Sequence, residues 1–201
     1  MIDEREQRPI RRQRALEAER GSGAGFASTA CPRDQDRALA NTLVGRAIPA
    51  LRLTAFTGAH RELRRDTDPA AVIYCYPGTV SSPDGGSDSG VGDAAQHQAF
   101  DRHRDELNLF ALRAIGLSSE SEHAQRATAF ENRIGHELWS DPDMLLARAL
   151  GLPTFAQAGV SGYRRLTVVV FAGKIAKAFF PVESPQRTAA QVISWLKATG
   201  H

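Results

Sequence analysis

Cysteine is scarce in this chain, and a long hydrophobic run is absent. The two cysteines, Cys31 and Cys75, form neither a Cys-x-x-Cys pair nor a zinc-type spacing, which argues against a disulfide-rich scaffold and a structural zinc site. No stretch of about 18 apolar residues occurs, as a membrane-spanning helix would require. The chain begins with charged residues rather than with a basic stub and an apolar segment. We therefore expect a cytoplasmic protein that does not bind a membrane.

An excess of charge of one sign is also absent. The chain has 25 Lys and Arg residues against 23 Asp and Glu residues, which gives a net charge of +2. Its largest local basic excess, at residues 8–14, is followed by Glu17 and Glu19, so the charge pattern favours no nucleic-acid partner. The sequence has no phosphate-binding motif and no cluster of four Cys and His residues. We predict neither a cofactor nor a metal ion.

One globular domain of ordinary size fits the 201 residues and their hydrophobic content of 42%. Residues 1–42 are rich in Arg, Glu, Gln, Gly and Ser, and their apolar residues are too sparse for a core. We predict that they form an N-terminal tail, largely mobile or partly helical, with one helical stretch near residues 12–20. Residues 43–201 form the predicted domain.

The apolar pattern of this domain changes between strand and helix spacing. Residues 70–76 form a nearly continuous apolar run, as in a central strand that is covered on both faces. The other predicted strands are 51–56, 109–117 and a hairpin over 165–180, and residues 137–141 are predicted as a short strand or a loop. The predicted helices are 93–107, 120–134, 144–150 and a last helix that begins near Ser184. This order predicts an α/β thioredoxin-like sandwich, a mixed central β-sheet flanked by helices on both faces.

A polar segment, residues 78–92, follows the predicted central strand. It is rich in Ser, Asp, Gly and Pro, which predicts a loop. In an open α/β sheet, the chemistry usually lies beyond the carboxyl end of such a strand. We therefore predict that Tyr76, Pro77 and Thr79 bind a small-molecule substrate. Tyr74, on the same face of the strand as Tyr76, is expected in the core.

Six segments, in the right order, resemble the peroxiredoxin superfamily, in particular its Q-type or bacterioferritin-comigratory branch. They are 44–49 (VGRAIP), 72–77 (VIYCYP), 116–119 (GLSS), 138–142 (LWSDP), 146–155 (LARALGLPTF) and the hairpin 165–180. The resemblance implies a thioredoxin fold. It also implies a thiolate nucleophile at the first turn of the helix after the loop and a nearby arginine, and in many members a resolving cysteine five residues after the nucleophile.

Neither thiol of that family is present. Aligning residues 99–100 with the family's helix puts Asp93 at the position of the nucleophile and Gln98 at the resolving position. A count without gaps from Pro77 puts Asp84 at the position of the nucleophile instead. A carboxylate cannot take up a peroxide oxygen as a cysteine does when it forms a sulfenic acid. We therefore do not expect a working peroxiredoxin.

Two interpretations of Asp93 stay open. With Gln96 it forms the Asp-x-x-Gln pattern of a helix N-cap and capping box. Alternatively, Asp93 is a general acid or base beside His97, which lies one helical turn later on the same face. Arg165, which the resemblance matches to the family's active-site arginine, would then bind an anionic substrate or a developing oxyanion. We predict Asp93, His97 and Arg165 as the catalytic residues, and we expect His136 on a helix surface or end.

Three functions are compatible with these residues. The first is a non-redox enzyme of secondary metabolism that performs a dehydration, isomerisation or cyclisation on a small organic molecule. The second is a non-catalytic binding or regulatory protein that forms a homodimer. The third is a thiol peroxidase that uses Cys75 or Cys31, although a cysteine in a buried strand usually serves as a small apolar residue.

Overall fold

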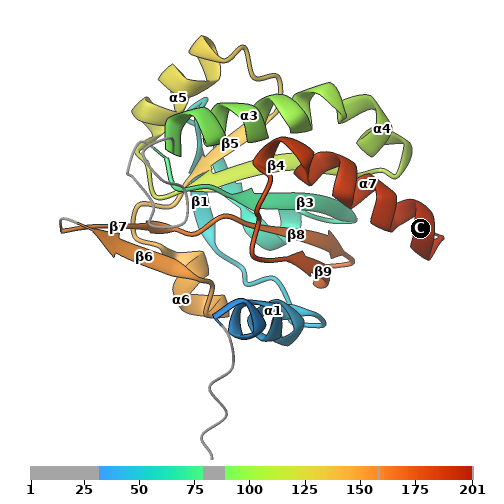
Figure 1. Cartoon of the computed structure of the whole chain (residues 1–201). Helices are drawn as coiled ribbons and strands as arrows, with labels where there is room; N and C mark the ends of the chain where they lie inside the picture. The colour runs from blue at the N-terminus through green and yellow to red at the C-terminus, as the bar shows by residue number, and fades with distance from the viewer. Residues whose placement is uncertain (1–31, 79–88, 158, 201) are drawn as a thin grey trace, which may run out of the picture. The chain divides into compact units, whose positions relative to one another are not determined.

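The computed structural model describes residues 32–78, 89–157 and 159–200 (Figure 1). Within these ranges, every helix is too short or too polar to cross a membrane. Several sequence predictions lie outside the described residues: the helical stretch at 12–20, Cys31, Thr79 and Asp84.

A seven-stranded mixed sheet forms the centre of the domain, in the order β2-β1-β5-β4-β3-β8-β9. Its strands are β1 Arg52–Ala55, β2 His60–Glu62, β3 Ala70–Cys75, β4 Arg113–Ser118, β5 Glu137–Ser140, β8 Leu166–Phe171 and β9 Lys174–Phe179. The pairs β3–β4 and β4–β5 are parallel, and the other pairs are antiparallel. β3 is buried along its whole length, as its continuous apolar run predicts.

Helices cover both faces of this sheet (Figure 1). They are α1 Pro32–Leu43, α2 Leu63–Asp66, α3 Ser89–Arg102, α4 Arg104–Leu109, α5 Glu122–Glu131, α6 Leu145–Leu150, the 3-10 helix η2 Pro185–Arg187 and α7 Thr188–Thr199. α1 and α6 pack on one face, and α3, α4, α5 and α7 pack on the other. A mixed sheet with helices on both faces confirms the predicted thioredoxin-like α/β fold.

The alternation of side chains along β3 divides the core into two clusters. Ile73 and Cys75 pack with apolar side chains of α1 and α6, whereas Val72 and Tyr74 pack with those of α3 and α7. Tyr76, just beyond β3, belongs to the second cluster. The two tyrosines therefore lie on the α3 side of the sheet, and Cys75 lies on the opposite side.

Helix α3 begins earlier than predicted. It spans Ser89–Arg102, whereas the sequence pattern predicted a helix over 93–107. Gly90 and Gly92 favoured a loop, because a glycine inside a helix costs roughly 1 kcal/mol relative to alanine. Most helical stability in proteins comes from tertiary packing, and α3 packs against α7 and η2.

Two further elements differ from the sequence prediction. The strand predicted over 109–117 begins at Arg113, because Leu109 is the last residue of α4 and is 84% exposed. A small antiparallel sheet of β6 Thr154–Gln157 and β7 Val160–Tyr163 was not predicted. Its strands lack the regular alternation of apolar residues that marks a strand.

Helix α1 lies within the segment predicted as a partly helical tail. Ala40 and Leu43 are buried in the core cluster on that face of the sheet, and α1 packs on β9. Arg164, which precedes β8, donates two hydrogen bonds of 3.0 Å to the carboxylate of Asp36 in α1. Apolar and ionic contacts therefore join α1 to the domain.

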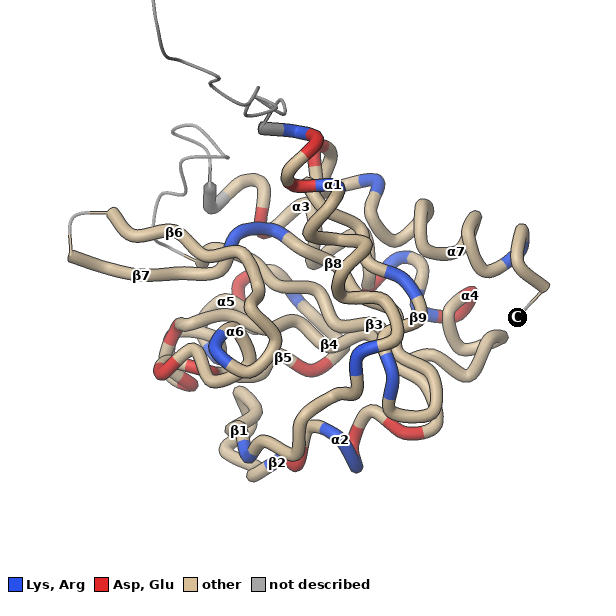
Figure 2. Tube along the Cα trace, turned by 90° about the horizontal axis from the view of Figure 1, so that it is seen from below, with Lys and Arg blue, Asp and Glu red and all other residues tan. Residues whose placement is uncertain are grey.

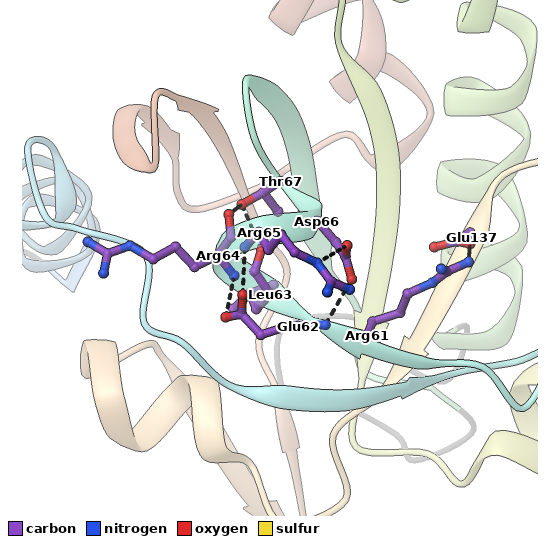
Figure 3. A network of polar contacts seen from close by, with 8 residues as sticks. All are labelled: Arg61, Glu62, Leu63, Arg64, Arg65, Asp66, Thr67 and Glu137. Carbon is purple, nitrogen blue, oxygen red and sulfur yellow. Dashed lines mark hydrogen bonds and ion pairs between the residues drawn. The ribbon is translucent and has the colours of Figure 1, made fainter.

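Helix α2 shows how neighbouring side chains fix a short turn (Figure 3). The carboxylate of Glu62 accepts hydrogen bonds from the backbone N–H groups of Arg64 (3.2 Å) and Arg65 (3.0 Å). The carboxylate of Asp66 in turn accepts a hydrogen bond of 2.8 Å from the N–H of Glu62. This reciprocal capping satisfies N–H groups that a helix start leaves without partners.

Candidate functional site

The candidate site lies where the carboxyl end of β3 meets the buried face of α3. Asp93, Gln96, His97 and Phe100 recur along α3 at the spacing of one helix face, and all four side chains are buried. This face therefore carries a carboxyl, an amide and an imidazole into the interior of the protein. Buried polar groups of this kind need hydrogen-bond partners.

Asp93 does not cap α3. Because the helix begins at Ser89, Asp93 lies more than one turn inside it, and the residue is only 5% exposed. The predicted capping box of Asp93 and Gln96 is therefore wrong. Both side chains turn inward from the middle of the helix instead.

Arg165 follows β7, precedes β8 and is buried beside α3. Its guanidinium forms an ion pair with the carboxylate of Asp93, and its Nη1 donates a hydrogen bond of 3.1 Å to Oε1 of Gln96. The helix allows this approach because residue 92 is glycine: a Cβ at Gly92 would stand 2.8 Å from Arg165 Nη2. Two of the three predicted catalytic residues, Asp93 and Arg165, are therefore in direct contact.

The Asp93 carboxyl is able to gain and lose a proton near neutral pH. Burial raises its pKa from 3.8 to about 7, although the neighbouring charge of Arg165 acts in the opposite direction. Among the smaller causes that together set this pKa, the charge of Glu120 raises it and a hydrogen bond from the backbone of Gly78 lowers it. A carboxyl in this pKa range is suited to general acid or general base catalysis.

His97 is neutral at physiological pH, and one of its ring nitrogens has no partner among the described residues. Its pKa is lowered to about 3, mainly by burial and to a smaller extent by the neighbouring His136 and Arg165. Its Nδ1 lies 2.7 Å from the hydroxyl of Tyr74, whereas no described residue hydrogen-bonds its Nε2. The ring of Tyr76 meets the imidazole edge-on, with 4.6 Å between the ring centroids.

His136 is buried in this cluster and does not lie on a surface as predicted. Its Nε2 lies 2.6 Å from the Tyr74 hydroxyl, and its Nδ1 lies 3.1 Å from Oδ1 of Asp101. Tyr74 reaches across β4 at Gly116, where a Cβ would stand 2.7 Å from the tyrosine hydroxyl. No sequence pattern points to this contact, because it joins three segments that are far apart in the chain.

The remaining predicted positions are placed as follows. Tyr76 and Pro77 are buried at the carboxyl end of β3, and their role in binding a substrate stays a prediction. Thr79 lies outside the described residues. Gln98, aligned with the resolving position of peroxiredoxins, is exposed on α3.

Cys75 is poorly placed for a reaction with peroxide. It is 1% exposed and belongs to the core cluster on the face opposite Asp93 and His97. Burial raises the pKa of its thiol, and the charge of Asp141 raises it further. Because the nucleophile in such a reaction is an accessible thiolate, this setting disfavours a thiol peroxidase that uses Cys75.

Other features of the described chain do not define a second site. Three surface hollows have volumes of about 730, 500 and 400 Å³. Asp93, His97 and Arg165 line none of these three hollows. Glu120, whose charge acts on Asp93, lines the smallest one. In the described ranges, no group of three His, Cys, Asp or Glu side chains is arranged to hold a metal ion. Charged segments of both signs are interspersed along the chain (Figure 2). Buried polar contacts therefore define the candidate site.

Comparison with known proteins bears on the fold. No protein-family model matches the sequence. No curated protein matches it either.

Solved structures match the fold over most of the chain. Peroxidoxin BcpB from Mycobacterium tuberculosis matches with a TM-score of 0.65 and 20% identity, over 77% of this chain and 96% of that one. A cysteine-to-serine mutant of PrxQ from Xylella fastidiosa matches with a TM-score of 0.66 and 20% identity, over 79% and 97%. The bacterioferritin comigratory protein of Xanthomonas campestris matches with a TM-score of 0.63 and 24% identity, over 78% and 100%. The chain therefore has the thioredoxin-like fold of these peroxiredoxins.

Proposed function

We propose that the chain is a non-redox enzyme that performs acid–base chemistry on a small organic molecule. Asp93 is the acid or base, His97 is its partner, and Arg165 is the anchor for an anion. The observation that carries the proposal is the buried ion pair of Asp93 and Arg165, in which the carboxyl has a pKa of about 7. Groups whose pKa is shifted by burial together with a specific charge are concentrated at functional sites.

The pair of Asp93 and Arg165 couples proton transfer to charge stabilisation. When Asp93 takes a proton from a substrate, the carboxyl becomes neutral and the charge of Arg165 is left uncompensated. The substrate then carries the negative charge, and Arg165 stabilises it. Isomerisation, dehydration and cyclisation each require the return of that proton to a different carbon or oxygen atom. No step of this kind needs an oxidant or a reductant.

The burial of the cluster indicates the direction from which a substrate reaches it. Arg165 is 8% exposed, Asp93 is 5% exposed and His97 is fully buried. In this proposal, a substrate approaches from the side of Arg165 and Asp93, and His97 lies deeper in the site. In this proposal, Tyr76 and Pro77 line the deeper part beside His97.

A proton-exchange screen tests this function. The full chain is incubated in deuterium oxide with a panel of small hydroxy acids and keto acids, and proton NMR follows deuterium uptake and product formation. We expect turnover of at least one compound, and we expect Asp93→Asn to lower that rate by at least about tenfold. Asp105→Asn, a substitution at an exposed aspartate of α4, is the matched control and should leave the rate unchanged. Equal rates for Asp93→Asn and the native chain would exclude Asp93 as the acid or base.

The burial of the same residues favours a non-catalytic binding protein as the second candidate. His97 is fully buried, and the guanidinium of Arg165 already contacts Asp93 and Gln96. Under this alternative, the cluster stabilises the fold, and the chain binds a ligand or partner without converting it. Thermal-shift measurements with the same compounds separate the two candidates, since binding without exchange or turnover favours the binding protein. Both candidates include the predicted cytoplasmic location and the predicted homodimer. Sedimentation of the purified chain tests the homodimer.

A further inference from the structure

A row of hydrogen bonds runs from Asp101 through His136 and Tyr74 to His97. His136 Nδ1 lies 3.1 Å from Asp101 Oδ1, and His136 Nε2 lies 2.6 Å from the Tyr74 hydroxyl. That hydroxyl lies 2.7 Å from His97 Nδ1, and all three distances are those of hydrogen bonds. We propose that this row holds the proton of His97 on Nδ1, so that Nε2 carries a lone pair and accepts a hydrogen bond from an O–H or N–H group of the ligand.

The direction of each hydrogen bond in this row follows from Asp101, the residue at its acidic end. The carboxylate of Asp101 only accepts, so the first proton sits on His136 Nδ1. The same oxygen of Asp101 also accepts the N–H of Gly135 at 3.0 Å. Neutral His136 then has its lone pair on Nε2, and Tyr74 donates its single hydroxyl hydrogen to that atom. The Tyr74 oxygen is left to accept from His97, which places the His97 proton on Nδ1.

Both imidazoles are neutral, as this argument requires. Burial is the main cause that lowers the pKa of His97 and of His136, although Asp101 acts in the opposite direction on His136. Neutral His97 with its proton on Nδ1 has a lone pair on Nε2. This buried atom has no hydrogen-bond partner among the described residues, so a ligand that brings a donor satisfies it.

The packing around Tyr74 keeps its hydroxyl between the two histidines. The ring of Tyr74 stacks on Phe100, with 4.4 Å between ring centroids and an interplanar angle of 11°. Gly116 leaves the space that the hydroxyl occupies, since a Cβ there would stand 2.7 Å from it. Tyr74, His136 and Asp101 therefore act on the site through His97, as positioning residues.

Nitrogen-15 NMR of the imidazoles tests the proposed tautomer in the full chain without any ligand. At a pH of about 8, where the imidazoles are neutral, we expect the proton of His97 on Nδ1. Tyr74→Phe removes the hydroxyl and should release His97 into a mixture of tautomers or into the Nε2–H form. Tyr163→Phe is the matched control. It removes a buried hydroxyl that donates to Asp141 at 2.6 Å on the other face of the sheet, and it should leave the His97 signals unchanged.

Two Asp101 variants keep the test decisive if Tyr74→Phe fails to fold. The Asp101 side chain is 26% exposed, so its replacement disturbs the core less. Asp101→Asn retains an acceptor oxygen, so His97 should keep its proton on Nδ1. Asp101→Ala removes the acceptor, so His97 should no longer hold its proton on Nδ1 alone. A native His97 with its proton on Nε2, or a folded Asp101→Ala variant with an unchanged His97 tautomer, would overturn the proposal.

The ligand part of this inference rests on the proposed function, and its test is separate. Lactate offers a carboxylate for Arg165 and a hydroxyl for His97, and 2-methoxypropanoate keeps the carboxylate and the oxygen but carries a methyl group in place of the hydroxyl hydrogen. We expect lactate to shift the Nε2 signal of His97 and 2-methoxypropanoate to leave it in place. Equal shifts, or no shift with lactate, would overturn the ligand class while leaving the tautomer result intact. An Nδ1–H tautomer in a chain without turnover would contradict the proposed function alone.

Discussion

At the scale of single residues, Asp93 makes the stability of the fold depend on pH. Its pKa is about 7 in the folded chain, whereas an unburied aspartate has a pKa of 3.8. The folded state therefore keeps this proton over a pH range in which the unfolded state has already lost it. Stability falls with rising pH wherever the folded state binds more protons. The contribution of Asp93 to folding is thus most favourable below the lower pKa, declines between the two values and is constant above the higher one.

Asp93→Asn removes this titration and keeps the size of the side chain. We expect the free energy of unfolding of the variant, relative to the native chain, to rise by on the order of 2 kcal/mol between about pH 5 and pH 8. Urea denaturation at several pH values in this range measures the difference. Since the other ionisable groups are present in both proteins, their contributions largely cancel. A constant difference across the range would show that Asp93 has an ordinary pKa.

Cys75 leads to a second prediction at the residue scale. Its thiol is buried, and burial raises its pKa, so almost no thiolate is available to attack a peroxide. We expect Cys75→Ser and the native chain to consume hydrogen peroxide at the same rate in the presence of dithiothreitol, since Cys75 supplies no thiolate. Peroxide consumption that disappears in Cys75→Ser would restore the thiol peroxidase as the function of the chain.

At the scale of the element, Gly92 sets how closely α3 approaches Arg165. Alanine is preferred over glycine in a helix by roughly 1 kcal/mol, but a Cβ at residue 92 would stand 2.8 Å from Arg165 Nη2. Gly92→Ala should therefore displace the guanidinium from Asp93. Because Arg165 lowers the pKa of Asp93, we expect that pKa to rise further, as carbon-13 NMR of the carboxyl would record.

Ala94→Gly is the control for this substitution. It changes helix propensity in the same part of α3 and should cost roughly 1 kcal/mol of stability without a change in the pKa of Asp93. An unchanged pKa in Gly92→Ala would mean that the guanidinium adjusts without leaving the carboxylate.

The elements also show what a sequence pattern can and cannot predict. The apolar runs of β3 and β8 are nearly continuous, so the burial of these two strands in the sheet was predictable. The start of α3 was not, because Gly90 and Gly92 favour a loop. For the site, the resemblance to peroxiredoxins predicted that Asp93 and Arg165 belong to the same site. The contact of Tyr74 with His136 depends on the space above Gly116, which no periodicity encodes.

At the scale of the whole described domain, α1 and the candidate site lie on opposite faces of the sheet. Ala40 and Leu43 of α1 belong to one core cluster, whereas Tyr74, which contacts the site histidines, and Phe100, which stacks on Tyr74, belong to the other. Removal of α1 should therefore lower stability without changing the residues that make up the site.

Truncation of the chain tests where the domain begins. We expect a chain that starts at Pro32 to keep the stability of the full chain, since residues 1–31 have too few apolar residues for a core. A chain that starts at Val44 lacks α1. It should lose at least about 3 kcal/mol, because a fully buried leucine such as Leu43 contributes roughly 2 kcal/mol and further apolar burial and an ion pair are lost with it. Urea denaturation of the three proteins measures this, and equal stability of the two shortened chains would place the start of the domain at residue 43, as the apolar pattern alone predicts.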